Sequence, residues 1–151
     1  MVKSVCNYKQ AYTQYGGLRP FGVAFLFAGY DKHYGFQLYQ SDPSGNYSGW
    51  KATVIGQNNQ SGKSILKTDY SEDGTTEKNL KLAVKILLKT MDSATPSPER
   101  IEISTMRVDP NRPGNTIHVT LKETEVAALI EQIQKEEEAE QKKASASSGD
   151  I

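Results

Sequence analysis

The segment from Phe21 to Tyr30 is apolar at nearly every position, and large and small side chains alternate along it. Because successive residues of a strand point to opposite faces, this pattern separates the large from the small side chains. The larger set is Phe21, Val23, Phe25 and Phe27, and the intervening set is Gly22, Ala24, Leu26 and Ala28. A strand that is apolar on both faces is typical of a central strand covered from two sides. The segment therefore predicts a layered fold built around a sheet.

The rest of the chain alternates between the periods of helix and strand. Spacings of three and four predict helices over residues 2–15, 61–70, 75–91 and from about Thr124 onward. Alternating patterns and turn residues predict strands at 34–40, 47–55, 100–107 and 117–121. Strands in successive runs and helices in pairs predict an α+β fold, with antiparallel sheets and helices layered outside them.

Charge and cysteine content exclude several classes of protein. The 18 basic and 18 acidic residues give no net charge, which argues against general binding of nucleic acid. Cys6 is the single cysteine, so no disulfide can form within the chain. The densest apolar run, 21–28, is far shorter than the ~20 residues of a membrane-spanning helix. Residues 1–6 lack the apolar stretch of a signal peptide, and we expect a cytoplasmic and nuclear protein.

No set of side chains predicts catalysis. The segment Gly56–Ser64 resembles a phosphate-binding loop, but five residues rather than four separate its two glycines, so we favour a loop and helix start. We expect Cys6 to be a buried, unreactive thiol, and we expect His33 and His118 to be solvated or structural. The sequence thus predicts no cofactor and no metal ion, and nucleotide binding at Gly56–Ser64 remains a minor hypothesis.

Residues 10–23 read QAYTQYGGLRPFGV, and at this point the sequence closely resembles the proteasome α-type subunits. In that family a helix end runs through R-P-F-G-V into a central strand. The resemblance continues at 29–31, 37–39, 42–47 and 50–52, and it extends to about residue 133. Within the family, the string at 31–47 is most similar to the α type-4 branch, which takes the α3 position of the ring.

The resemblance implies a four-layer αββα sandwich of the N-terminal-nucleophile hydrolase type, in which helix pairs cover two antiparallel sheets. Members of the family begin with a gating tail, a helix, strands and a further long helix. By comparison, this sequence begins inside the long helix, and we expect a fold that is incomplete at the N-terminus. We predict that residues 1–135 form the larger, C-terminal part of the domain and that 136–151 form a charged, Ser/Ala-rich disordered tail.

The resemblance also implies a noncatalytic structural subunit of the outer α ring of the 20S proteasome core, which supports ATP- and ubiquitin-dependent protein degradation. Its partners would be neighbouring α subunits, β-ring subunits and regulatory particles, and neither nucleic acid nor membrane. The family motifs supply the candidates for structural and interface residues. They are Tyr12, Gly16, Gly17, Arg19, Pro20, Phe21, Gly22, Asp31, Asp42, Pro43, Ser44, Gly45, Trp50 and Lys51.

Two alternatives remain open at this stage. The chain could be an N-terminal-nucleophile hydrolase with its own activity, which would require an exposed Thr, Ser or Cys at a processed N-terminus, and Ser4 and Cys6 are the nearest candidates. It could also be a truncated fragment without function.

Overall fold

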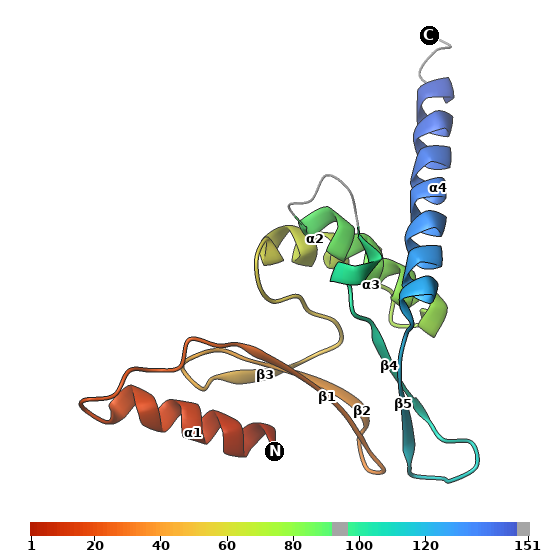
Figure 1. Cartoon of the computed structure of the whole chain (residues 1–151). Coiled ribbons are helices and arrows are strands. Elements are labelled where there is room, and N and C mark those ends of the chain that lie inside the picture. The colour runs from red at the N-terminus through yellow and green to blue at the C-terminus, as the bar shows by residue number, and fades with distance from the viewer. Residues whose placement is uncertain (92–96, 148–151) are drawn as a thin grey trace. The chain divides into compact units, whose positions relative to one another are not determined.

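The computed structural model describes residues 1–91 and 97–147, with five strands and four α-helices among them (Figure 1). The elements are α1 (Val2–Gln14), β1 (Phe25–Asp31), β2 (Gly35–Ser41), β3 (Tyr47–Trp50), α2 (Asn59–Asp69), α3 (Thr76–Thr90), the 3-10 turn η1 (Pro98–Arg100), β4 (Ser104–Val108), β5 (Thr116–Thr120) and α4 (Glu123–Ser147). Helix and sheet together confirm the α+β class. The chain divides into two compact units, Met1–Leu66 and Lys67–Ile151, which are described separately below.

The first unit contains a three-stranded antiparallel sheet in the order β1-β2-β3. Helix α1 contacts strands β2 and β3 and lies beside the sheet (Figure 1). The expectation of a central strand covered on both faces is not met in this unit, because β1 begins only at Phe25 and lies at the edge of the sheet. The preceding segment is not part of the sheet, and Phe25 and Leu26 remain 40% and 43% exposed.

Helix α1 faces the sheet with a different side from the one that its tyrosines predict. The buried residues of α1 are Cys6 and Lys9, which lie three positions apart and therefore share one face. Tyr8 and Tyr15 are exposed. The predicted end of the helix is confirmed: α1 stops before Gly16, and Gly17 has a φ of 84° that suits glycine. Cys6 is buried, as the sequence predicts.

The second unit is organised around one apolar cluster. Its buried members are Val84, Ile101, Ile103, Val126, Ile130 and Ile133. They come from α3, from the chain between η1 and β4, and from α4, so the cluster joins segments that are distant in sequence. The predicted cap of α3 is confirmed, since the Thr75 hydroxyl accepts a hydrogen bond of 3.2 Å from the Lys78 N–H. Strands β4 and β5 form an antiparallel hairpin from Ser104↔Thr120 to Val108↔Thr116.

Helix α4 continues to Ser147, well beyond Ile133, which is the last buried residue among the positions of α4 whose burial is described. The segment up to Ser147 is therefore helical in the structure, although the sequence predicts a disordered tail from residue 136. Ion pairs from Lys81 to Glu136 (2.8 Å) and from Lys89 to Glu137 (3.1 Å) join the first part of this extension to α3. The end of the predicted tail, residues 148–151, lies outside the described residues, and the division of the chain at residue 136 stays a prediction.

The apolar cluster yields a first test of the fold. We expect Ile130→Ala to lower the free energy of unfolding by about 2–5 kcal/mol, because it removes buried methyl groups and leaves a cavity against Val84 and Val126. The control is Gln132→Ala at an exposed position of the same helix, which should change it by less than about 0.5 kcal/mol. Urea denaturation measures both, and equal losses would show that α4 does not contribute to the core.

Candidate interaction surface

A buried lysine connects α1 to the sheet. Lys9 is only 2% exposed, and its Nζ donates hydrogen bonds to Val23 O (2.8 Å), Ser41 Oγ (3.0 Å) and Asp42 O (3.3 Å). The same ammonium lies 4.4 Å from the centre of the Phe25 ring, which adds a cation–π contact. These groups belong to the chain that enters β1 and to the chain that leaves β2. Lys9 therefore fixes both relative to the helix.

The turn after β2 is shaped by the side chain of Asp42. Its Oδ1 accepts hydrogen bonds from the backbone N–H of Ser44 (2.8 Å) and of Asn46 (3.2 Å). The Ser44 hydroxyl is the largest cause that lowers the pKa of Asp42, since it also donates to the carboxylate. Gly45 completes the turn with a φ of 94°. The predicted turn is confirmed, and its residue types explain it.

The same turn lies directly against α1. A Cβ atom placed on Gly45 would lie 2.5 Å from the carbonyl oxygen of Cys6 and 2.9 Å from the backbone nitrogen of Gln10. Both atoms are backbone atoms of the helix and cannot move aside independently. Gly45 is therefore required for its positive φ and for this close approach. Of the motif residues, Asp42, Ser44 and Gly45 are brought together in this turn, whereas Tyr12 of α1 contacts Tyr8 and Phe21 instead. Pro43 is exposed.

Three aromatic side chains, two from α1 and one from the chain that precedes β1, pack against one another. The ring of Phe21 lies 4.9 Å from that of Tyr12 and 5.9 Å from that of Tyr8, centre to centre. The two tyrosine hydroxyls are 3.3 Å apart, and this hydrogen bond is the main cause that raises the pKa of Tyr12. A mainly apolar groove of about 360 Å³ opens beside the cluster and is lined by Ser4, Val5, Tyr8, Lys9, Phe21, Val23 and Phe25.

The β1–β2 hairpin is closed by Asp31. Its carboxylate accepts hydrogen bonds from the N–H groups of Tyr34 and His33, both 2.8 Å, and from the Gln37 side chain at 2.6 Å. These donors lower the pKa of Asp31, with the Tyr34 N–H as the largest cause. The motif residue Asp31 therefore has a structural role in this turn.

The remaining motif residues lie apart from the turn at Asp42 and Gly45. Gly16, Gly17, Arg19, Pro20 and Gly22 belong to the chain between α1 and β1, where Arg19 bonds only weakly to Pro20 O at 3.4 Å. Trp50 ends β3, with its Nε1 bonded to Ser48 Oγ (2.7 Å) and its ring 5.9 Å from Lys63 Nζ. Lys51 follows Trp50 and is exposed. These residues do not form one site with Asp42 and Gly45.

One face of the sheet is turned away from α1. Ser41 contacts Lys9 of α1, so the odd-numbered residues of β2 face the helix and the even-numbered ones face the other way. The strand register places Leu26, Phe36 and Trp50 together on that other face. They are 43%, 53% and 44% exposed. We call this group the exposed apolar face. Trp50 is one of the motif candidates, whereas Leu26 and Phe36 are not among them.

The sequence patterns also failed to identify Lys9 as a buried residue. A lysine in an otherwise amphipathic helix is normally assigned to solvent, and no local pattern identifies the neutral oxygen atoms that it meets. Its position three residues after Cys6 is the one sequence signal that places it on the buried face.

The segment Gly56–Ser64 does not form a phosphate cradle. Gly56 and Asn58 make a turn with φ values of 96° and 57°, and α2 begins at Asn59. The Gly62 N–H donates to Asn58 O (3.2 Å), so it is already used within the first turn of the helix. A phosphate-binding loop needs such N–H groups to converge on the ligand. The structure therefore favours the loop and helix start over the nucleotide hypothesis.

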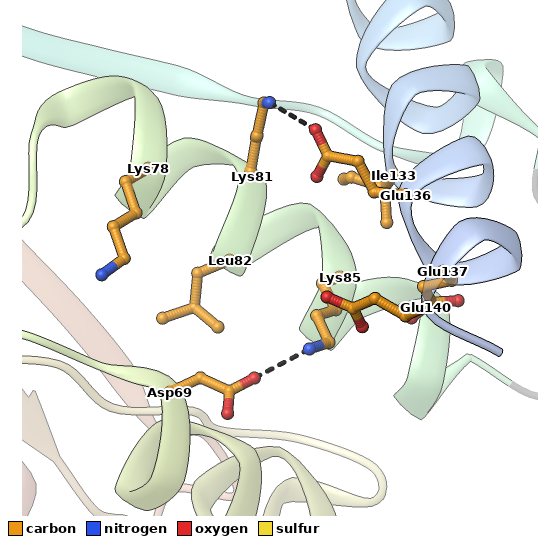
Figure 2. A pocket seen from close by; sticks show the side chains of 9 residues that line it. All are labelled: Asp69, Lys78, Lys81, Leu82, Lys85, Ile133, Glu136, Glu137 and Glu140. Atoms are coloured by element: carbon orange, nitrogen blue, oxygen red, sulfur yellow. Dashed lines mark hydrogen bonds and ion pairs between the residues drawn. The ribbon is translucent and has the colours of Figure 1, made fainter. Parts of the chain in front are cut away.

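In the second unit, a cleft of about 500 Å³ lies between α3, α4 and the end of α2 (Figure 2). Lys81 pairs with Glu136 and Lys85 pairs with Asp69, both at 2.8 Å, and these hydrogen bonds raise the pKa of each lysine. Because these two lysines of α3 pair with carboxylates of α4 and α2, the two ion pairs help to join the helices. Within residues 1–91 and 97–147 there is no cluster of three His, Cys, Asp or Glu suited to a metal, and no helix long and apolar enough to cross a membrane.

The fold and the motif residues define a class. The chain matches the proteasome subunit family over residues 1–106, and it belongs to that family. It is 58% identical over 112 residues to proteasome subunit alpha type-4-A of Arabidopsis thaliana, which covers 74% of this chain and 45% of the relative. It is 60% identical over 111 residues to proteasome subunit alpha type-4 of Spinacia oleracea, covering 74% of this chain and 44% of that relative. The chain thus spans less than half the length of these relatives, and the sequence-based resemblance is confirmed.

Replacing Gly45 tests the contact between the turn and α1. We expect Gly45→Ala to destabilise the chain clearly more than Gly35→Ala. Both glycines have positive φ, 94° and 70°, but a Cβ at Gly35 would meet nothing within 4 Å. The Gly35 variant therefore measures the backbone cost alone, about 1–2 kcal/mol, and the difference measures the clash with α1. Thermal unfolding provides the values, and equal losses would contradict the close approach.

Acid should weaken the hairpin through Asp31. Because its pKa is lower in the folded than in the unfolded chain, the unfolded chain binds the proton more readily. The stabilisation is present above the unfolded pKa and is lost as the pH falls through the folded pKa. We expect Asp31→Asn to reduce the dependence of the unfolding free energy on pH across this acidic range. Denaturation at several pH values measures it, and parallel curves for the two proteins would refute the role of Asp31.

Proposed function

We propose that this chain serves as a noncatalytic, structural α-type subunit in the outer ring of the proteasome core. The observation that carries the proposal is its identity of 57–60% to subunits named proteasome subunit alpha type-4. In this role the chain would support ATP- and ubiquitin-dependent protein degradation in the cytoplasm and nucleus. Its partners would be adjacent α subunits, β-ring subunits and regulatory particles.

The arrangement of the first unit supports an assembling role. The motif residues Asp31, Asp42 and Gly45 shape turns, and they leave the exposed apolar face available for packing. Large apolar side chains such as Phe36 and Trp50 are typical of surfaces that become buried on association.

An independent hydrolase activity has less support. Cys6 is 1% exposed and lies within α1, so it would act as a terminal nucleophile only after the helix had unwound. Ser4 lines the groove beside Tyr8 and lies in the first turn of the same helix. We therefore expect the purified chain not to hydrolyse fluorogenic peptides.

Incorporation into the complex is the direct test. We expect an epitope-tagged chain expressed in Arabidopsis cells to co-sediment with proteasome core subunits. Phe36→Lys should abolish co-sedimentation, because it places a charge in the exposed apolar face. Tyr34→Lys, at an 81% exposed position two residues earlier in the same hairpin, is the matched control and should not.

A tagged chain that never enters the core complex would refute the structural role. Peptide hydrolysis by the purified chain, abolished by replacing Ser4 or Cys6, would instead establish the hydrolase. The two measurements are separate, so the failure of one leaves the other interpretable.

A further inference from the structure

The loop between α2 and α3 contains Asp73 followed by Gly74, the one Asp-Gly step in the chain. In such a step the backbone nitrogen of the glycine lies close to the side-chain carboxyl carbon of the aspartate, so a ring can close between them. Glycine has no Cβ to obstruct this approach, and it lets the backbone rotate into it. Asp73 is exposed, and among the residues that the structure describes no hydrogen bond or ion pair holds its carboxylate.

The other aspartates among the described residues lack this combination of features. Asp42 and Asp109 each precede a proline, whose nitrogen carries no hydrogen to lose when a ring closes. The carboxylate of Asp31 accepts three hydrogen bonds, and that of Asp69 pairs with a lysine of α3 at 2.8 Å. Asp73 is therefore the described aspartate that is best placed to react with its own backbone.

The shape of the loop favours a glycine at position 74. A Cβ atom there would lie 2.8 Å from Asn79 Oδ1 and 3.0 Å from the carbonyl oxygen of Ser71. The Gly74 N–H donates a hydrogen bond to Ser71 O (3.1 Å), and the Gly74 carbonyl accepts one from Asn79 Nδ2 (3.3 Å). The close contacts of the loop thus favour the residue type that makes Asp73 reactive.

We propose that Asp73 is a site of isoaspartate formation. The Gly74 nitrogen bonds to the Asp73 carboxyl carbon, and a water molecule made of the carboxyl hydroxyl and the amide hydrogen leaves. Water then adds to the resulting succinimide and breaks the bond between this nitrogen and the main-chain carbonyl carbon of Asp73. The backbone now runs through the Asp73 side chain, a free α-carboxylate remains, and no oxidant or reductant is needed. The proposal does not rest on the proposed function.

The modification would disturb the start of α3, because it lengthens the backbone by one methylene directly before the helix cap. The Thr75 hydroxyl accepts a hydrogen bond from the Lys78 N–H (3.2 Å), and the Thr75 carbonyl accepts one from the Asn79 N–H (3.0 Å). Moving Thr75 weakens both bonds, and α3 is the helix that places Val84 in the apolar cluster. The new α-carboxylate is the chemical group that isoaspartyl methyltransferases methylate with S-adenosylmethionine.

The test is incubation of the folded full chain at neutral pH, followed by transfer of a radiolabelled methyl group from S-adenosylmethionine by an isoaspartyl methyltransferase. We expect the label to grow with time in the wild-type chain. Asp73→Glu should gain at least about tenfold less, because the extra methylene moves the carboxyl carbon away from the Gly74 nitrogen. Asp69→Glu is the matched control and should gain label as the wild type does. Peptide mapping with a protease that cleaves at aspartate but not at isoaspartate locates the modified residue.

Two further measurements examine the loop and the consequence for α3. Asn79→Ala removes the hydrogen bond to the Gly74 carbonyl, so it should speed the gain of label. The labelled fraction should melt at a temperature lower by about 2–8 °C, which is the shift that loss of a helix cap produces in a chain of this size. No label in the folded wild-type chain, or equal label in Asp73→Glu, would overturn the proposal.

Discussion

The ammonium group of Lys9 determines the arrangement of the first unit. A charge that leaves water loses hydration free energy, and it stays buried only where other groups replace the water. Here the oxygen atoms of Val23, Ser41 and Asp42 and the ring of Phe25 take that place. Because these groups come from separate segments, Lys9 can be satisfied only when the helix, the entry to β1 and the turn after β2 are all in position.

Part of this structure could be predicted because it depends on residues that are close together in the sequence. The cap at Thr75, the turn at Asp42–Asn46 and the hairpin closed by Asp31 depend on residues within a few positions of one another. The buried face of α1 depends on oxygen atoms more than ten residues away, and no periodicity of the helix reports them. The tyrosines predicted the wrong face because they pack on Phe21 at the rim rather than on the sheet.

The length of α4 also depends on contacts that the local sequence does not report. The apolar stripe ends at Ile133, and a reading of the sequence by burial alone ends the ordered chain there. The structure continues the helix past Glu136 and Glu137, which pair with lysines of α3. Such partly exposed ion pairs contribute little to stability, so helix propensity must supply much of the remainder. Family motifs likewise identified turn residues but not Leu26 and Phe36, since apolar strand residues look alike whether they are buried or exposed.

The exposed apolar face is the surface through which the first unit can recognise another part of a protein. A face is recognised by the shapes of its side chains, so Leu26, Phe36 and Trp50 can select a particular partner. A sheet with one helix on one side and such a face open buries little apolar area by itself. The stability and the selectivity of the first unit then both depend on what covers this face.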